Sequence, residues 1–138
     1  AYCGGLIGGG SPGEVEALAA YGENFGVAYQ LSDDLQEIEE GSVSDLRAGR
    51  VTLPYLHLYR FGGPEARKLI SEVFGLGEVD GRKAEELRRR LNASGSLEYC
   101  RRKVAEYVGR AIESLKPLRE SRYKEFLGEF ARRYTGLG

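Results

Sequence analysis

The chain has 138 residues, of which 41% are hydrophobic and 30% charged, and its formal net charge is −1. This length is enough for one domain with its own core. The balanced charge argues against a nucleic-acid-binding protein, which would normally carry a basic excess. No apolar run approaches the roughly 20 residues needed to cross a bilayer, so no transmembrane segment is expected.

The first strong helix signal starts at Ser11. This residue is expected at the N-cap, with Pro12 in the first helical position and Glu14 completing a capping box. Nothing breaks the helix before Gly41, so it is expected to extend for roughly 40 Å at 1.5 Å per residue. Residues 1–8 are small and apolar and have no polar lead-in, which favours a chain cut inside a tightly packed helix.

The remainder of the chain is also predicted to be helical. A short loop is expected over residues 41–51, and the last helix over residues 123–134. No segment shows the sustained alternation that is typical of a strand. The fold class is therefore all-α, and residues 1–138 are expected to form a single all-helical segment. Further helices are expected to start around Thr52, Pro64, Asp80 and Ser96.

Four polar side chains follow one face of the long helix. Gln30, Asp33, Asp34 and Glu37 are spaced i, i+3, i+4 and i+7, inside an arc of about 100°. The flanking positions are apolar around most of the circumference, which is typical of a buried helix. Buried carboxylates repel each other and lose hydration, so a cationic partner is expected, and Mg²⁺ prefers such hard oxygen ligands. On spacing alone, a strip that faces solvent or pairs with Arg and Lys remains an alternative.

The sequence around this strip resembles one known family. Residues 29–37, YQLSDDLQE, are similar to the second aspartate-rich motif, FQxxDDxxD, of the trans-isoprenyl diphosphate synthases. This is the family of the farnesyl and geranylgeranyl diphosphate synthases. Before the motif, Tyr21-Gly22 and Gly26 resemble the family's YG…G. After it, residues 45–54, DLRAGRVTLP, resemble DL…GKxTLP.

The resemblance implies the C-terminal half of an all-α helical bundle of the isoprenoid synthase type. It implies a cytoplasmic, homodimeric prenyltransferase of isoprenoid biosynthesis that requires Mg²⁺ and condenses an allylic diphosphate with isopentenyl diphosphate. By position, Asp33 is the candidate for direct metal ligation, and Asp34 and Glu37 would ligate the metal directly or through water. Gln30 would be a polar contact to substrate. No catalytic residue is separable from metal and substrate binding.

The chain departs from the family pattern in three respects. Glu37 stands where the motif usually has Asp, and the loop after the motif lacks the family's lysine. Arg47 and Arg50 are the candidate replacements that would bind the substrate diphosphate, although guanidinium and ammonium groups differ in reach and geometry. The family's first aspartate-rich motif does not occur in this sequence, so the segment alone is expected to be inactive.

A second interpretation comes from a different class of protein. The chain could belong to a non-catalytic regulatory subunit or pseudoenzyme that associates with a complete prenyl synthase. The missing lysine and the altered motif favour this interpretation, whereas the retained carboxylates favour the enzyme. The regulatory interpretation predicts tight association with a complete synthase and no turnover of its own.

Overall fold

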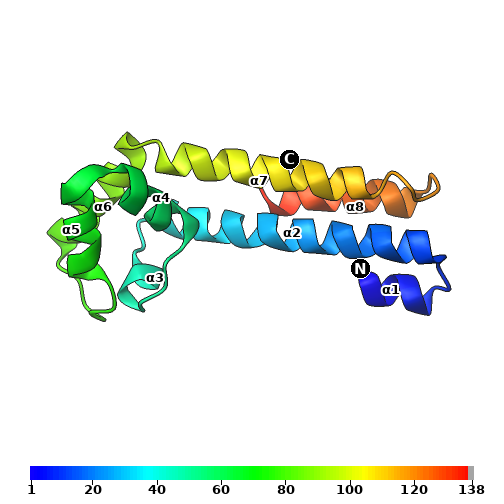
Figure 1. Cartoon of the computed structure of the whole chain (residues 1–138), viewed down its shortest axis with the longest axis horizontal. Helices are drawn as coiled ribbons and strands as arrows, with labels where there is room; N and C mark the ends of the chain where they lie inside the picture. Colours follow the sequence, from blue (N-terminus) through cyan, green and yellow to red (C-terminus); the bar gives the residue numbers. More distant parts are fainter. Residues whose placement is uncertain (137–138) are drawn as a thin grey trace. The chain divides into compact units, whose positions relative to one another are not determined.

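The computed structural model describes residues 1–136, which form helices joined by short connections (Figure 1). This part of the chain contains no strand, so the all-α prediction is confirmed. None of its helices is long and apolar enough to cross a membrane. The helices are α1 (Tyr2–Ile7), α2 (Pro12–Glu39), α3 (Ser44–Arg47), α4 (Leu53–Phe61), α5 (Gly63–Val73), α6 (Gly81–Ala93), α7 (Ser96–Ser114) and α8 (Arg122–Tyr134).

The chain groups into two compact units. The first contains Ala1–Ser32 and the chain from Lys103 on, and the second contains Asp33–Arg102. Helices α2 and α7 therefore each contribute to both units. That residues 1–138 are one segment, forming half of a larger domain, stays a prediction.

The start of α2 follows from local hydrogen bonds. The Ser11 amide and hydroxyl both donate to Glu14 Oε2 at 2.9 Å, and the Glu14 amide donates to Ser11 Oγ at 3.4 Å. Pro12 opens the helix, where its missing N–H leaves no intrahelical bond unmade. This is the capping box that the sequence predicts. Immediately before it, a Cβ at Gly5 would lie 3.0 Å from the Leu18 side chain, so glycine allows α1 to approach α2 closely.

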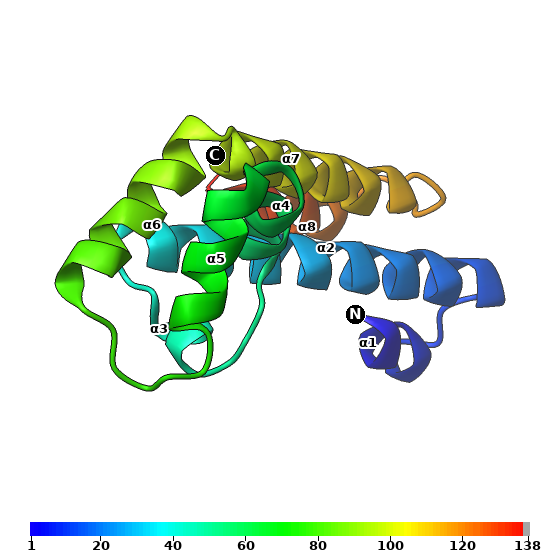
Figure 2. The ribbon, with the colours of Figure 1, turned by 60° about the vertical axis from the view of Figure 1, so that its left-hand side comes forward.

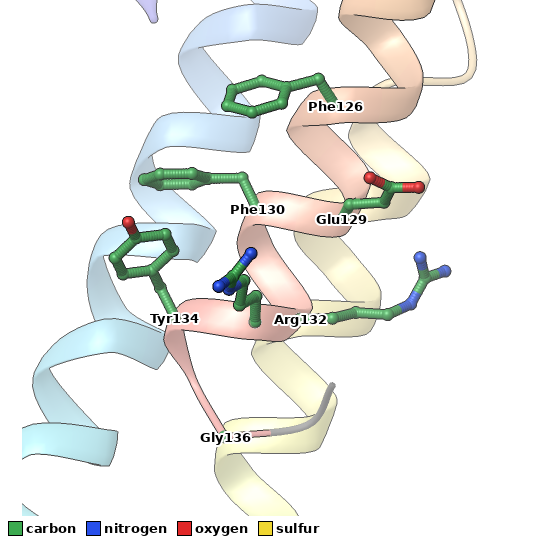
Figure 3. Close-up of a pocket in the computed structure, with 7 residues that line it drawn as sticks. Phe126, Glu129, Phe130, Arg132, Tyr134 and Gly136 are labelled. Atoms are coloured by element: carbon green, nitrogen blue, oxygen red, sulfur yellow. The ribbon is translucent and has the colours of Figure 1, made fainter.

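The first unit is held together by aromatic contacts between α2 and α8. Tyr21 is buried, and its hydroxyl donates to the Leu127 carbonyl at 2.8 Å. The Tyr21 ring stacks on Phe25 with centroids 6.0 Å apart, and the Phe25 centroid lies 5.3 Å from that of Phe130. Figure 3 shows Phe130 projecting from α8 towards α2. Because aromatic pairs at these distances add to the burial of apolar area, they fix α8 along this part of α2.

The second unit packs α4, α5 and α6 against one another, with α3 against α5 (Figure 2). Two ion pairs join α6 to α5, Lys83 with Glu72 at 2.8 Å and Arg90 with Glu65 at 2.9 Å. Exposed pairs of this kind contribute about 1 kcal/mol or less, so the apolar core carries the stability of the unit. Its largest fully buried apolar side chains are Leu46, Pro54, Tyr55, Leu58, Val73, Leu87, Leu91 and Cys100.

The connections in the second unit agree with most of the sequence predictions. Asp80 caps α6, because its Oδ1 accepts the Arg82 amide at 3.0 Å. Helix α7 starts at Ser96, as expected. The loop predicted over residues 41–51 is wrong in its middle, because α3 occupies Ser44–Arg47. A single turn of helix carries no periodicity that a sequence could reveal.

His57, the single histidine, joins α4 to the start of α7. Its Nδ1 lies 3.0 Å from Oγ of the fully buried Ser96, and its ring stacks on Tyr99 with centroids 4.4 Å apart. Burial of the imidazole, and then the charge of Arg102, lower the pKa of His57 below its usual value of 6.5. The neutral ring is therefore the form that the folded unit favours.

This lowered pKa predicts that stability depends on pH. Below about pH 6.5 the unfolded chain binds a proton at His57 that the folded chain does not. The free energy of unfolding should therefore be highest above pH 6.5 and fall as the pH drops towards the lower folded pKa. Urea denaturation between about pH 5 and pH 8 measures this slope. The His57→Gln variant should lose it, and an unchanged slope in that variant would contradict the assignment.

Candidate functional site

The end of α2 places the three carboxylates of the motif, Asp33, Asp34 and Glu37, in different surroundings. Asp33 is exposed, Asp34 is buried with 9% of its surface accessible, and Glu37 is half-buried. Leu35 and Ile38 are buried and anchor this end of the helix in the core of the second unit. The three carboxylates therefore do not form the uniformly buried strip that their spacing suggested. Of the three carboxylates, Asp33 is the one presented to solvent.

Gln30 and Asp34 lie on parts of α2 that belong to different units. Asp34 lies close to Cys100, where burial first, and then the Asp34 charge, raise the pKa of the thiol to about 12. The thiol is therefore protonated at neutral pH and packs as a small apolar group. Gln30 is exposed on the part of α2 that belongs to the first unit.

Glu37 is bound by the segment that follows α2. Its Oε1 accepts the hydroxyl of Ser42 at 3.2 Å, the amide of Asp45 at 3.3 Å and the hydroxyl of Ser44. These hydrogen bonds, the one from Ser44 first, outweigh burial and lower the pKa of Glu37; the charge of Arg50 also contributes. The sequence reasoning missed both serines. Their signal was two hydroxyls placed directly after a helix end, where such residues bond to neighbouring groups.

The two candidate cations, Arg47 and Arg50, differ in what they contact. Arg50 Nε donates to Asp45 Oδ1 at 2.8 Å, and the two side chains form an ion pair. Arg47 Nε donates to the Gly77 carbonyl at 2.6 Å, in the connection between α5 and α6. Arg50 therefore pairs with the carboxylate of Asp45, whereas Arg47 connects α3 to the loop between α5 and α6.

Tyr55 of α4 is a further residue near Glu37 that the sequence reasoning missed, after the two serines. Its side chain is 1% exposed, and its hydroxyl has no hydrogen-bond partner in residues 1–136. Burial first, and then the charges of Glu37 and Asp45, raise the pKa of the phenol. Tyr55 therefore stays neutral beside the two carboxylates. Its only sequence signal is its position directly after Pro54, which fixes the local backbone but not what the ring faces.

The carboxylates fit one part of a magnesium site. In the part of the chain that the structure describes, no three His, Cys, Asp or Glu side chains converge closely enough to hold a metal ion. Mg²⁺ commonly binds through one or two carboxylates together with waters and substrate phosphates. The exposed Asp33 carboxylate, which has no side-chain partner in residues 1–136, suits that role. The remaining ligands would have to come from outside this set of residues.

Comparison with known proteins identifies the family. The family model described as polyprenyl synthetase matches residues 1–91. The chain belongs to this family. The resemblance recognised from the motif and its flanks is confirmed. The roles of Asp33, Asp34, Glu37, Gln30 and the two arginines stay predictions.

The relatives among curated proteins are prenyl diphosphate synthases. The chain is 34% identical over 135 residues to octaprenyl diphosphate synthase of Escherichia coli K12, covering 92% of this chain and 41% of that protein. It is 33% identical over 138 residues to geranylgeranyl diphosphate synthase of Methanosarcina mazei, covering 95% and 41%. The chain therefore spans about two-fifths of the length of these relatives.

Solved structures show the same fold. A geranylgeranyl pyrophosphate synthase of Corynebacterium glutamicum, complexed with calcium and isoprenyl diphosphate, matches with a TM-score of 0.86 and 27% identity over 98% of this chain and 44% of that one. A decaprenyl diphosphate synthase of Rhodobacter capsulatus matches with a TM-score of 0.89 and 23% identity over 98% and 44%. The prediction of an isoprenoid synthase bundle is thereby confirmed.

Proposed function

We propose that the protein carrying this chain condenses an allylic diphosphate with isopentenyl diphosphate. The chain would contribute the second aspartate-rich motif to a magnesium and diphosphate site. The observation that carries this proposal is the exposed Asp33 carboxylate within YQLSDDLQE, in a chain of the polyprenyl synthetase family. The related Corynebacterium synthase was solved with a divalent cation and an isoprenyl diphosphate, which supports such a site.

The proposed reaction needs charge neutralisation and exclusion of water. The C–O bond of the allylic diphosphate breaks, and the diphosphate leaves with the electron pair. The double bond of isopentenyl diphosphate then forms the new C–C bond, and loss of a proton completes the longer chain. Bound magnesium would supply positive charge for the leaving diphosphate.

The residues of this chain would hold and orient the reacting groups. Asp33 would hold the metal, and Asp34 would act as a further ligand, directly or through water. Arg50 would place a guanidinium beside the diphosphate, in the role that lysine has in the family pattern. Gln30 would contact the substrate. The homodimer and the cytoplasmic location expected from the resemblance stay predictions.

The second candidate is the non-catalytic regulatory subunit. One observation favours it: Arg47 and Arg50 both already have partners within the second unit, Gly77 and Asp45. A diphosphate would have to compete with Asp45 for Arg50. Charge-assisted bonds from guanidinium to phosphate are strong enough for such an exchange, so the enzyme remains the better-supported proposal.

The test is a condensation assay on the natural protein that carries this chain. Labelled isopentenyl diphosphate and allylic diphosphates of several lengths are supplied with Mg²⁺ or with a chelator. Chain-elongated product is expected with Mg²⁺ and none with the chelator, and the 138-residue chain alone is expected to give none. If the natural protein gives no product and instead binds a complete synthase tightly, the regulatory candidate replaces the enzyme.

A further inference from the structure

Helix α3 lacks a cap of its own. It has four residues, and its N-cap residue, Val43, makes no side-chain hydrogen bond. A helix this short is not stable alone, and the N–H groups of its first turn need acceptors from elsewhere. Glu37 of α2 supplies one, because its Oε1 accepts the amide of Asp45 at 3.3 Å. A side chain of the preceding helix therefore performs the capping that Val43 cannot.

The same oxygen also binds Ser42, between the two helices, and Ser44, the first residue of α3. Ser42 Oγ donates to Glu37 Oε1 at 3.2 Å and accepts the Ser44 amide at 3.1 Å, while the Ser44 hydroxyl also donates to that oxygen. The Ser42 amide donates to the Glu37 carbonyl at 3.0 Å. Both the backbone and the side chain of Glu37 thus bind the residues that lead into α3.

The hydrogen bonds continue from Glu37 to Arg50. Asp45, whose amide Glu37 accepts, holds the Arg50 Nε through its own Oδ1 at 2.8 Å. The Arg50 amide donates to the Asp45 carbonyl at 2.8 Å, after Gly49 turns the chain with a φ of +75°. Asp45 therefore connects Glu37 to the guanidinium proposed to face the diphosphate. If Glu37 moved, α3 would lose its cap and Arg50 its fixed partner.

We infer that Glu37 is a positioning residue, which fixes α3 and so the place of Arg50, and that it does not ligate the metal. Its Oε1 already accepts three donors, which a metal ion at this oxygen would displace, so the oxygen that fixes α3 is not free for a metal. The extra methylene of Glu over the family's Asp gives the carboxylate the reach to these groups. The catalytic consequence rests on the proposed function, but the structural consequence does not.

The first test measures the segment itself, without metal or substrate. Hydrogen exchange of the Asp45 amide is compared in the natural protein and in its Glu37→Ala, Ser44→Ala and Glu37→Gln variants. Loss of a cap should speed exchange about tenfold in Glu37→Ala, with a smaller increase in Ser44→Ala. Glu37→Gln keeps an acceptor oxygen at the same length and should retain the protection. Glu40→Ala is the matched control, because Glu40 is exposed and, within residues 1–136, its carboxylate accepts only the Gln36 side-chain amide.

The second test separates positioning from metal binding. Glu37→Gln should leave the Mg²⁺ concentration for half-maximal activity within about twofold, whereas Asp33→Asn should raise it about tenfold or more. Glu37→Ala should raise the KM for the diphosphate substrate, because Arg50 is no longer fixed. The inference is overturned if Glu37→Gln shifts the Mg²⁺ requirement as far as Asp33→Asn, or if Glu37→Ala leaves Asp45 protected. If exchange behaves as expected but the protein shows no condensation, the positioning stands and the proposed function fails.

Discussion

Asp33→Ala is expected to reduce Mg²⁺-dependent condensation by about a hundredfold or more without unfolding the protein. Removal of one group that stabilises charge in a transition state commonly costs this much. Asp33 is the exposed carboxylate of the motif and has no side-chain partner in residues 1–136. Its loss should therefore change the free energy of unfolding by no more than about 0.5 kcal/mol. The measurement is kcat/KM at several Mg²⁺ concentrations, together with urea denaturation.

The matched control for Asp33→Ala is Glu40→Ala. Glu40 is also an exposed acidic residue, directly after α2, and in the part of the chain that the structure describes its carboxylate accepts only the Gln36 side-chain amide. Its removal changes the net charge by the same amount, so a general electrostatic effect would appear in both variants. Unchanged turnover in Asp33→Ala at both low and high Mg²⁺ would show that the metal assignment is wrong.

The parts of the fold that the sequence predicted depend on interactions between residues that are close in the sequence. The capping box of Ser11 and Glu14 needs only residues three apart, and the cap of Asp80 on the Arg82 amide needs residues two apart. The apolar residues of α7 recur with helical spacing, and the structure buries them: Leu97, Cys100, Val104, Val108 and Ala111. Such signals lie within a single helix or its first turn, so they can be recognised before the tertiary structure is known.

The candidate site could be located from the sequence, but the exposure and the partners of its individual side chains could not be predicted. Spacing placed Asp33, Asp34 and Glu37 on one face, yet their exposure differs because other elements cover them unequally. Asp34 is close to Cys100, sixty-six residues away, and Glu37 is bound by α3. Helix periodicity predicts the face of the helix on which a residue lies. Whether that residue is buried depends on which distant parts of the chain pack against that face.

The two arginines illustrate the same limit. Arg47 and Arg50 are three residues apart and equivalent as candidates in the sequence. The structure separates them, because Arg47 binds the Gly77 carbonyl thirty residues away and Arg50 binds Asp45. Tyr55 was missed for a related reason: its unpaired hydroxyl matters only because Glu37 and Asp45 come close to it. These features arise from the packing of α3, which no local pattern predicts.

Leu46→Ala is expected to lower the free energy of unfolding by about 2–5 kcal/mol, the usual range for a buried leucine. Leu46 is the buried residue of α3, with no exposed surface, and its carbonyl accepts the Gly75 amide at 2.9 Å. A four-residue helix depends on such tertiary contacts. Chemical denaturation measures the effect, and Leu56→Ala, at a 52% exposed position of α4, is the control, with a loss of less than about 1 kcal/mol. Equal stability of the two variants would show that the Leu46 side chain does not anchor α3.

Leu46→Ala should also weaken substrate binding, because α3 connects Glu37 to Arg50. Asp33→Ala is expected to lose activity and keep its stability, whereas Leu46→Ala is expected to lose both. If Leu46→Ala lost stability but kept its KM for the diphosphate, Arg50 would not depend on α3 for its position. The two variants together therefore separate the carboxylate that takes part in the chemistry from the turn of helix that holds its cationic neighbour.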